Sequence, residues 1–135
     1  MSGEIRYPSR EQVSELYEKT ITVSGGERGY VSRSNLDYLL DAVKDIGERL
    51  PRNQALVKKS AFLLYNVIVI HPFLNGNKRT AFDLAAAFLE ANGFELTAKP
   101  NDAYEFLLGV ASGKVSEGEA EGWIASHLAE AKKKK

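Results

Sequence analysis

The sequence predicts an all-α protein, a compact single domain of about six helices around a central helix pair. Apolar residues recur at intervals of three and four in several segments, which is the periodicity of helices that bury one face. The run from Ala61 to Ile70 is apolar almost throughout, as expected of a helix that other helices surround. The chain has 135 residues, of which 44% are apolar and 27% charged, and this composition suits one globular domain with a single core.

The first predicted helix covers residues 9–19. Ser9 and Gln12 have the spacing of a capping box, and the apolar residues that follow them fall on one helical face. Residues 20–32 contain three glycines, which exclude a regular helix. We therefore predict a loop there, with room for a short hairpin.

The next three helices form the middle of the chain. The second covers residues 35–50 and ends before Pro51. The third covers residues 53–70 and changes from amphipathic to almost wholly apolar along its length. The fourth covers residues 77–92, and Gly93 can close it in the left-handed conformation. We expect the third and fourth helices to form the central pair.

The C-terminal third continues the helical pattern after one short interruption. Residues 94–97 can form a short extended piece. Residues 101–110 predict a fifth helix, and Ser116 with Glu119 would cap a sixth that reaches about His127.

Charge and composition exclude several classes of function. The formal net charge is zero, so the whole molecule has no long-range attraction to nucleic acid, and we expect no direct nucleic-acid binding. The absence of cysteine excludes disulfides and thiolate metal sites. The N-terminus lacks the apolar segment of a secretory signal, and the longest apolar run is about half of the ~20 residues that a membrane span needs. We therefore expect a cytoplasmic protein with no membrane association.

The loop between the two central helices, within HPFLNGNKRT (residues 71–80), carries the candidate site. The start of the following helix presents unpaired N–H groups and the positive end of the helix dipole, which together favour a phosphate. Gly76 allows successive amides to curl toward one point. Lys78 and Arg79 add full positive charges at the same place.

Three more side chains in this loop have chemistry to offer. His71 can take up a proton near neutral pH, and a base beside a phosphate site fits transfer of a phosphorus-containing group to a hydroxyl. Asn75 and Asn77 can orient a ligand or steady hydrated Mg²⁺. We expect Phe73 to point inward and anchor the loop. Each residue alone has a simpler role as a cap, a turn or a solvated charge, so it is their joint spacing that indicates a site.

This segment resembles the signature of the Fic/Doc family, and specifically of its death-on-curing (Doc) branch, H-x-F-x-[D/N]-[A/G]-N-K-R. All seven specified positions are filled, by His71, Phe73, Asn75, Gly76, Asn77, Lys78 and Arg79. The segments SGGERGYVS, FLEANGFEL and GVASGKVSEGEAEGWIASHL also resemble Doc-type chains in order and spacing. The resemblance implies a Fic/Doc-like domain over residues 7–128, an N-terminal extension at 1–6 and a Lys-rich tail at 129–135, which we expect to be disordered.

The resemblance implies a toxin that uses ATP and Mg²⁺. In the Doc branch, Lys replaces the second Gly of the wider family's GNGR turn, and the γ-phosphoryl group of ATP passes to a threonine of translation elongation factor Tu. Protein synthesis then stops. By this resemblance His71 would be the general base, and Asn75 would occupy the metal position. The nucleotide would bind to four consecutive residues, Gly76, Asn77, Lys78 and Arg79.

Two positions depart from the wider family's pattern. Asn75 is a neutral amide where an acidic residue is commoner, which predicts weaker binding of Mg²⁺. Phe82 stands where the second Arg of the wider family's GRxxR would be, and this weakens the case for AMP transfer.

Many family members block themselves with a helix of pattern [S/T]-x-x-x-E-[G/N]. The segments Ser14–Glu18 and Ser126–Glu130 fit its first part, but Lys19 and Ala131 follow them, so we interpret both as ordinary helical surface. Inhibition would then come from a separate antitoxin with a disordered inhibitory tail that folds on binding.

Three functions remain open from the sequence. The first is a Doc-type kinase acting on a translation protein. The second is an AMP transferase of the wider Fic family. The third is a catalytically silent helical binding module whose loop docks an acidic partner.

Overall fold

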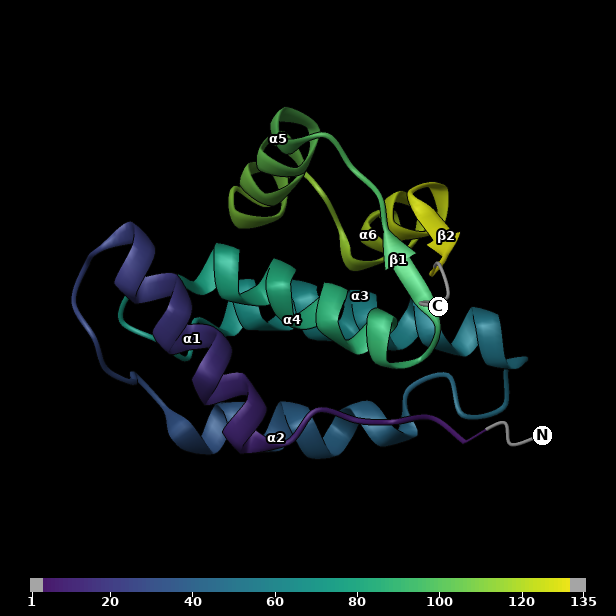
Figure 1. Cartoon of the computed structure of the whole chain (residues 1–135), viewed down its shortest axis with the longest axis horizontal. Helices are drawn as coiled ribbons and strands as arrows, with labels where there is room; N and C mark the ends of the chain where they lie inside the picture. Colours follow the sequence, from purple (N-terminus) through teal and green to yellow (C-terminus); the bar gives the residue numbers. More distant parts are fainter. Residues whose placement is uncertain (1–3, 132–135) are drawn as a thin grey trace, which may run out of the picture.

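The structure of the chain is a computed structural model that describes residues 4–131 (Figure 1). Its elements in chain order are α1 (Arg10–Ser24), α2 (Arg33–Ala42), the 3₁₀ turn η1 (Val43–Asp45), α3 (Arg52–Ile70), α4 (Asn77–Ala91), β1 (Phe94–Leu96), α5 (Pro100–Ala111), α6 (Glu117–Ser126) and β2 (Leu128–Glu130). Within the described range, six α-helices and one small two-stranded sheet confirm the predicted all-α domain.

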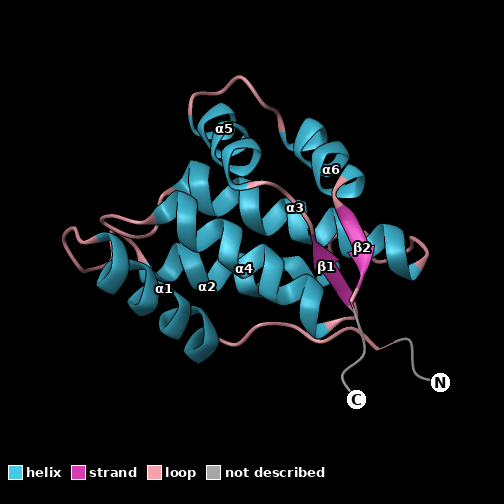
Figure 2. Ribbon diagram, turned by 45° about the horizontal axis from the view of Figure 1, so that its top comes forward, coloured by secondary structure: helices cyan, strands magenta, loops and turns pink. Residues whose placement is uncertain are grey.

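The helices α3 and α4 form the predicted central pair. They lie side by side, with α1 and α2 on one side of them and α5 and α6 on the other (Figures 1 and 2). α3 packs against α2, α4, α5 and α6, whereas α4 also packs against α1 and β1. Leu63 and Leu64 of α3 and Leu84 and Ala85 of α4 are all 0% exposed, so the core lies around this pair. The loop that joins α3 to α4 is thereby fixed at both ends by buried helices.

α1 is longer than the sequence predicts. The loop predicted from residue 20 is wrong over residues 20–24, which are helical. Thr20 and Ile21 are only 6% and 3% exposed, so core packing holds this last part in the helix. The helix stops at Gly25, whose φ of 78° a helical residue cannot have.

α2 is shorter than the sequence predicts. It ends at Ala42, and η1 and a turn replace the helix predicted to continue to residue 50. The buried Lys59 of α3 explains this end, because its Nζ donates hydrogen bonds to the carbonyl oxygens of Val43 (3.1 Å) and Lys44 (3.0 Å). The Val43 carbonyl also accepts from the Ile46 N–H (3.2 Å), so Lys59 adds a second donor there and gives the Lys44 carbonyl a donor at the end of the helical segment.

The short hairpin that residues 20–32 had room for does not form within the described chain. The loop pairs instead with the segment after α3, through an isolated antiparallel bridge between Tyr30 and Phe73. Loop and candidate site are therefore in backbone contact.

The second strand was not predicted. β1 confirms the expected extended piece, and it pairs antiparallel with β2 in a register that places Leu96 opposite Leu128. Ala129 and Glu130, which the sequence assigned to the tail, belong to β2. Residues 132–135 of that tail lie outside the described residues. The segment Ser126–Glu130 is consequently not a helical surface, because it spans the end of α6 and β2.

The N-terminal extension is partly described. Residues 1–3 lie outside the described range, and Ile5 packs against the core. The backbone of Arg6 is held by the buried side chain of Asn92, which accepts from its N–H (2.8 Å) and donates to its carbonyl (2.9 Å). No helix among residues 4–131 has the length and apolar character needed to cross a membrane.

Candidate functional site

The candidate loop begins where α3 ends, at His71. Its backbone is left-handed, with φ 62° and ψ 58°, and its N–H donates to the carbonyl of Val67 (3.0 Å). Among residues 4–131, it is the one non-glycine residue with a positive φ. A side chain in this conformation costs about 1–2 kcal/mol, and such strain concentrates at functional sites. The His71 side chain is exposed, so the ring can meet a ligand.

Phe73 anchors the loop as predicted. Its side chain is 0% exposed and stacks on Tyr17 of α1, with ring centroids 4.2 Å apart and an interplanar angle of 11°. Asn77 clamps the same residue from α4, because its Oδ1 accepts from the Phe73 N–H (3.0 Å) and its Nδ2 donates to the Phe73 carbonyl (2.8 Å). The sequence does not predict this clamp. The amide group is thus turned toward the backbone of Phe73, and the backbone N–H of Asn77 at the helix start remains a donor for an anion.

Gly76 precedes α4 and has the left-handed conformation that lets successive backbone amides turn toward one anion. Its φ of 79° and ψ of 17° are left-handed, and no side chain caps the helix start. A Cβ at this position would lie 3.2 Å from Cδ1 of Ile21 and 3.3 Å from Cγ2 of Thr20, so the contact with α1 also favours glycine. The first amides of α4 therefore remain open at the positive end of a helix of 15 residues.

Two neighbouring hollows flank the start of α4. The first, of about 350 Å³, is lined by His71 and by residues 74–78. The second, of about 590 Å³, adds Arg79 and Phe82 of α4 and Tyr104 of α5. Both include Gly76, Asn77 and Lys78 in their lining, so they meet at the helix start. His71 lines the smaller hollow and Arg79 the larger one, so the two side chains lie on hollows that adjoin.

The two cations of the loop differ in their partners. Lys78 is exposed, and within the described residues it makes no hydrogen bond or ion pair. Nε of Arg79 lies 3.3 Å from both carboxylate oxygens of Asp83, one helical turn further on. The Arg79 side chain is 72% exposed, and an exposed pair of this kind contributes only about 0.3–0.5 kcal/mol. A phosphate group can therefore compete for Arg79, and Lys78 is free to bind one.

Asn75 contacts the glycine-rich loop after α1. Its Nδ2 donates to the carbonyl of Glu27 at 3.2 Å, and the side chain also lines the hollow beside His71. No cluster of three or more His, Cys, Asp or Glu side chains suited to a metal ion occurs among the described residues. The predicted metal position therefore offers the amide oxygen of Asn75, and it belongs to no such cluster within residues 4–131.

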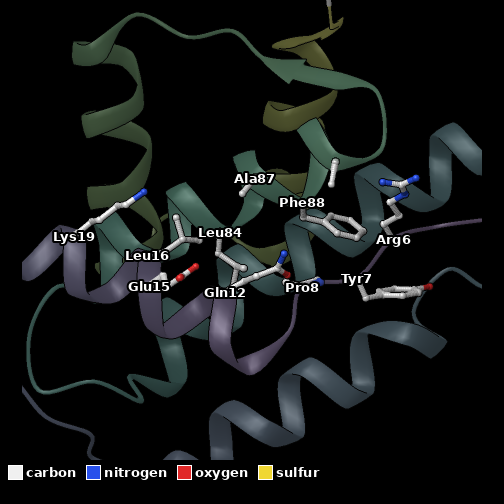
Figure 3. A pocket seen from close by; sticks show the side chains of 11 residues that line it. Arg6, Tyr7, Pro8, Gln12, Glu15, Leu16, Lys19, Leu84, Ala87 and Phe88 are labelled. Carbon is white, nitrogen blue, oxygen red and sulfur yellow. The ribbon is translucent and has the colours of Figure 1, made fainter.

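A further hollow of about 440 Å³ lies away from this loop (Figure 3). It is formed by α1, α4 and the N-terminal segment, with Leu16, Leu84 and Phe88 among its apolar walls and Glu15 and Lys19 among its charged residues. None of the residues predicted for the site contributes to its lining. The chemistry of the candidate site is therefore confined to the two hollows at the start of α4.

Comparisons with known proteins gave one family match. A family model described as "Fic/DOC family" matches residues 7–89, which include α1, most of α4 and the whole candidate loop. A search of curated proteins found no match.

Proposed function

The chain belongs to the Fic/DOC family, and on this premise we propose that it is a Doc-type toxin kinase. Members of the family are typically nucleotide-dependent transferases that modify proteins. The proposed reaction transfers the γ-phosphoryl group of ATP to a Ser or Thr hydroxyl of a translation protein similar to elongation factor Tu. The proposed consequence is arrest of translation in the cytoplasm.

The observation that carries the proposal is the position of Lys78. It lies in the first turn of α4, lines both hollows and has no anionic partner among the described side chains. The unpaired backbone N–H groups of the same turn also favour an anion. Together with Lys78 they would compensate the negative charge of a chain of phosphates along the boundary between the hollows. Phosphoryl transfer depends mainly on such positioning and charge stabilisation.

In the proposed reaction, His71 accepts the proton of the target hydroxyl. The hydroxyl oxygen forms a bond to the γ-phosphorus while the bond from that phosphorus to the bridging oxygen breaks, and ADP leaves. Lys78, Arg79 and the first amides of α4 stabilise the charge that develops on the phosphate oxygens. Mg²⁺ would add charge neutralisation on the phosphates, and the amide oxygen of Asn75 would be its ligand at the predicted metal position.

The residues that line the two hollows support γ-phosphoryl rather than AMP transfer. The larger hollow has apolar and aromatic walls that include Phe82, Tyr104 and Leu107, which suit a nucleoside. The smaller hollow contains His71 and suits the end of the phosphate chain. A nucleotide with its nucleobase in the larger hollow would present its terminal phosphoryl group to His71.

One experiment separates this function from its alternatives. The protein is incubated with the candidate translation factor and ATP labelled at the γ position, and then with ATP labelled at the α position. We expect γ label to reach the protein substrate. Transfer of α label instead would establish the AMP transferase, and transfer of neither would favour the silent binding module.

The proposed partner is an antitoxin whose disordered tail folds onto this chain. The first candidate for self-inhibition, Ser14–Glu18, has other contacts in the fold. Ser14 lies 3.1 Å from the Tyr30 hydroxyl, and Glu18 accepts from Nε of Arg28 at 2.9 Å. These contacts support a structural role for that segment, in keeping with the proposed separate antitoxin.

A further inference from the structure

The glycine-rich segment Gly25–Gly29 lies directly against the candidate loop. The N–H of Leu74 donates to the carbonyl of Gly29 at 2.9 Å. One residue further along the loop, Nδ2 of Asn75 donates to the carbonyl of Glu27 at 3.2 Å. A backbone contact and a side-chain contact from neighbouring loop residues thus hold the segment at two points.

The approach is close enough to favour glycine at two positions. A Cβ at Gly29 would lie 2.8 Å from Cδ1 of Leu74, and one at Gly26 would lie 3.2 Å from Cβ of Asn75. Both glycines also have positive φ, 141° and 102°, which side chains disfavour. The segment therefore packs on these two loop residues through bare backbone.

The identity of residue 75 matters for this contact. An amide offers N–H donors, whereas an ionised carboxylate offers only acceptors. A carboxylate at position 75 would bring a negatively charged oxygen toward the partly negative carbonyl oxygen of Glu27, where the amide now donates a hydrogen bond. The residue type that binds Mg²⁺ better is thus the one that cannot make this contact.

We propose that Asn75 is a positioning residue whose amide nitrogen latches the segment Gly25–Gly29 onto the candidate loop. An acidic residue at the same position would remove the hold on Glu27 and loosen that part of the segment, while Gly29 keeps its contacts with Leu74 and Tyr17. The latch itself rests on contacts alone. Only the corollary, that this chain gives up metal affinity to keep the segment in place, rests on the proposed kinase function.

The test is hydrogen exchange measured by mass spectrometry on the full chain. In Asn75→Asp, we expect amides of residues 24–32 to exchange roughly tenfold faster, because a hydrogen bond is lost and a repulsion replaces it. Asn75→Ala removes the bond without the repulsion, so its increase is expected to be smaller. Trypsin cleavage after the exposed Arg28 is expected to accelerate in the same order. The control is Asn53→Asp, the same exchange at an exposed position on α3, which is expected to leave this segment unchanged.

A second variant removes the contact from the other side. Gly26→Ala leaves Asn75 intact but adds a Cβ at a strained position against it. We expect faster exchange in the same segment, and we expect Asn75→Asp to add little in the Gly26→Ala background, because both act on one contact. Wild-type exchange in Asn75→Asp, or additive effects in the double variant, would overturn the latch. Neither readout needs catalysis, so a failed labelling experiment and a failed latch are distinguishable.

Discussion

Cationic side chains lie in the N-terminal half of α3 and also just beyond its C-terminal end, but the two groups differ in their partners. At its N-terminal half, Lys59 is 2% exposed and its ammonium donates to two backbone carbonyls of η1. Arg52 reaches the C-terminal end of α4 with Nη1 3.3 Å from the carbonyl of Asn92. At the C-terminal end, beyond His71, Lys78 and Arg79 are exposed.

The difference shows which cations are available to a ligand. A Lys or Arg that donates to helix-terminal carbonyls stabilises the ends of those helices and leaves little for binding. Lys78 has no such partner within the described chain, and it sits at the positive end of α4, where a cation is not stabilised by the helix dipole. A bound anion would compensate both the charge of Lys78 and the positive end of the helix dipole.

The largest effect is expected from His71→Asn, which tests the C-terminal end without changing its backbone. Asn tolerates the left-handed conformation better than most residues, so the loop is expected to keep its shape. Loss of a general base lowers kcat by about 10²–10⁴-fold. Transfer of γ label from ATP to the protein substrate is the measurement.

The control for this variant is its own stability. Urea unfolding is expected to differ from wild type by less than about 1 kcal/mol, because the side chain is exposed. Full transfer by His71→Asn would show that the base lies elsewhere.

The next largest effect is expected on the stability of the fold, from Lys59 in the N-terminal half of α3. Lys59→Met keeps much of the side-chain length but removes the donor to the carbonyls of Val43 and Lys44. The free energy of unfolding is expected to fall by about 1–3 kcal/mol, since two charge-assisted hydrogen bonds from a buried ammonium are lost. Urea denaturation measures it.

The adjacent residue provides a matched control. Lys58 pairs with Glu121 at 3.1 Å, but its side chain is 42% exposed. Lys58→Met is expected to cost less than about 1 kcal/mol. Equal losses in the two variants would remove the distinction between the buried and the exposed cations.

A smaller effect is expected from removing the cations beside His71. Lys78→Ala is expected to raise the KM for ATP about tenfold, which is the typical contribution of one charge-assisted hydrogen bond. Arg79→Ala is expected to raise it less, because Asp83 already neutralises part of that charge. Lys114→Ala, an exposed lysine outside both hollows, serves as the control. A larger effect of Arg79 than of Lys78 would contradict the role assigned to the first turn of α4.

The sequence could predict some of these features and not others. Local patterns were sufficient for the capping box at Ser116, because its hydrogen bonds join residues three apart in the chain, and the apolar character of Phe73 among polar residues was sufficient to predict that it points inward. The clamp by Asn77 and the cap by Lys59 depend on which polar atoms end up buried together, and amphipathic periodicity carries no such information. β2 was missed for the same reason, since a three-residue strand is stabilised by a partner far back in the sequence.

The smallest effect is expected in the larger hollow, at Tyr104 of α5. This side chain is 60% exposed although it is aromatic, and it lines the hollow together with Phe82. If a nucleoside stacks there, Tyr104→Ala is expected to raise the KM for ATP several-fold with little change in kcat, in keeping with about 1 kcal/mol for one aromatic contact. Tyr104→Phe is expected to keep the wild-type KM, because the ring is retained. Tyr38 on α2 is similarly exposed, at 64%, but lines neither hollow, so Tyr38→Ala is the matched control. An equal rise in KM in both alanine variants would show that the nucleobase does not bind in this hollow. The orientation that brings the γ-phosphoryl group to His71 would then lose its support.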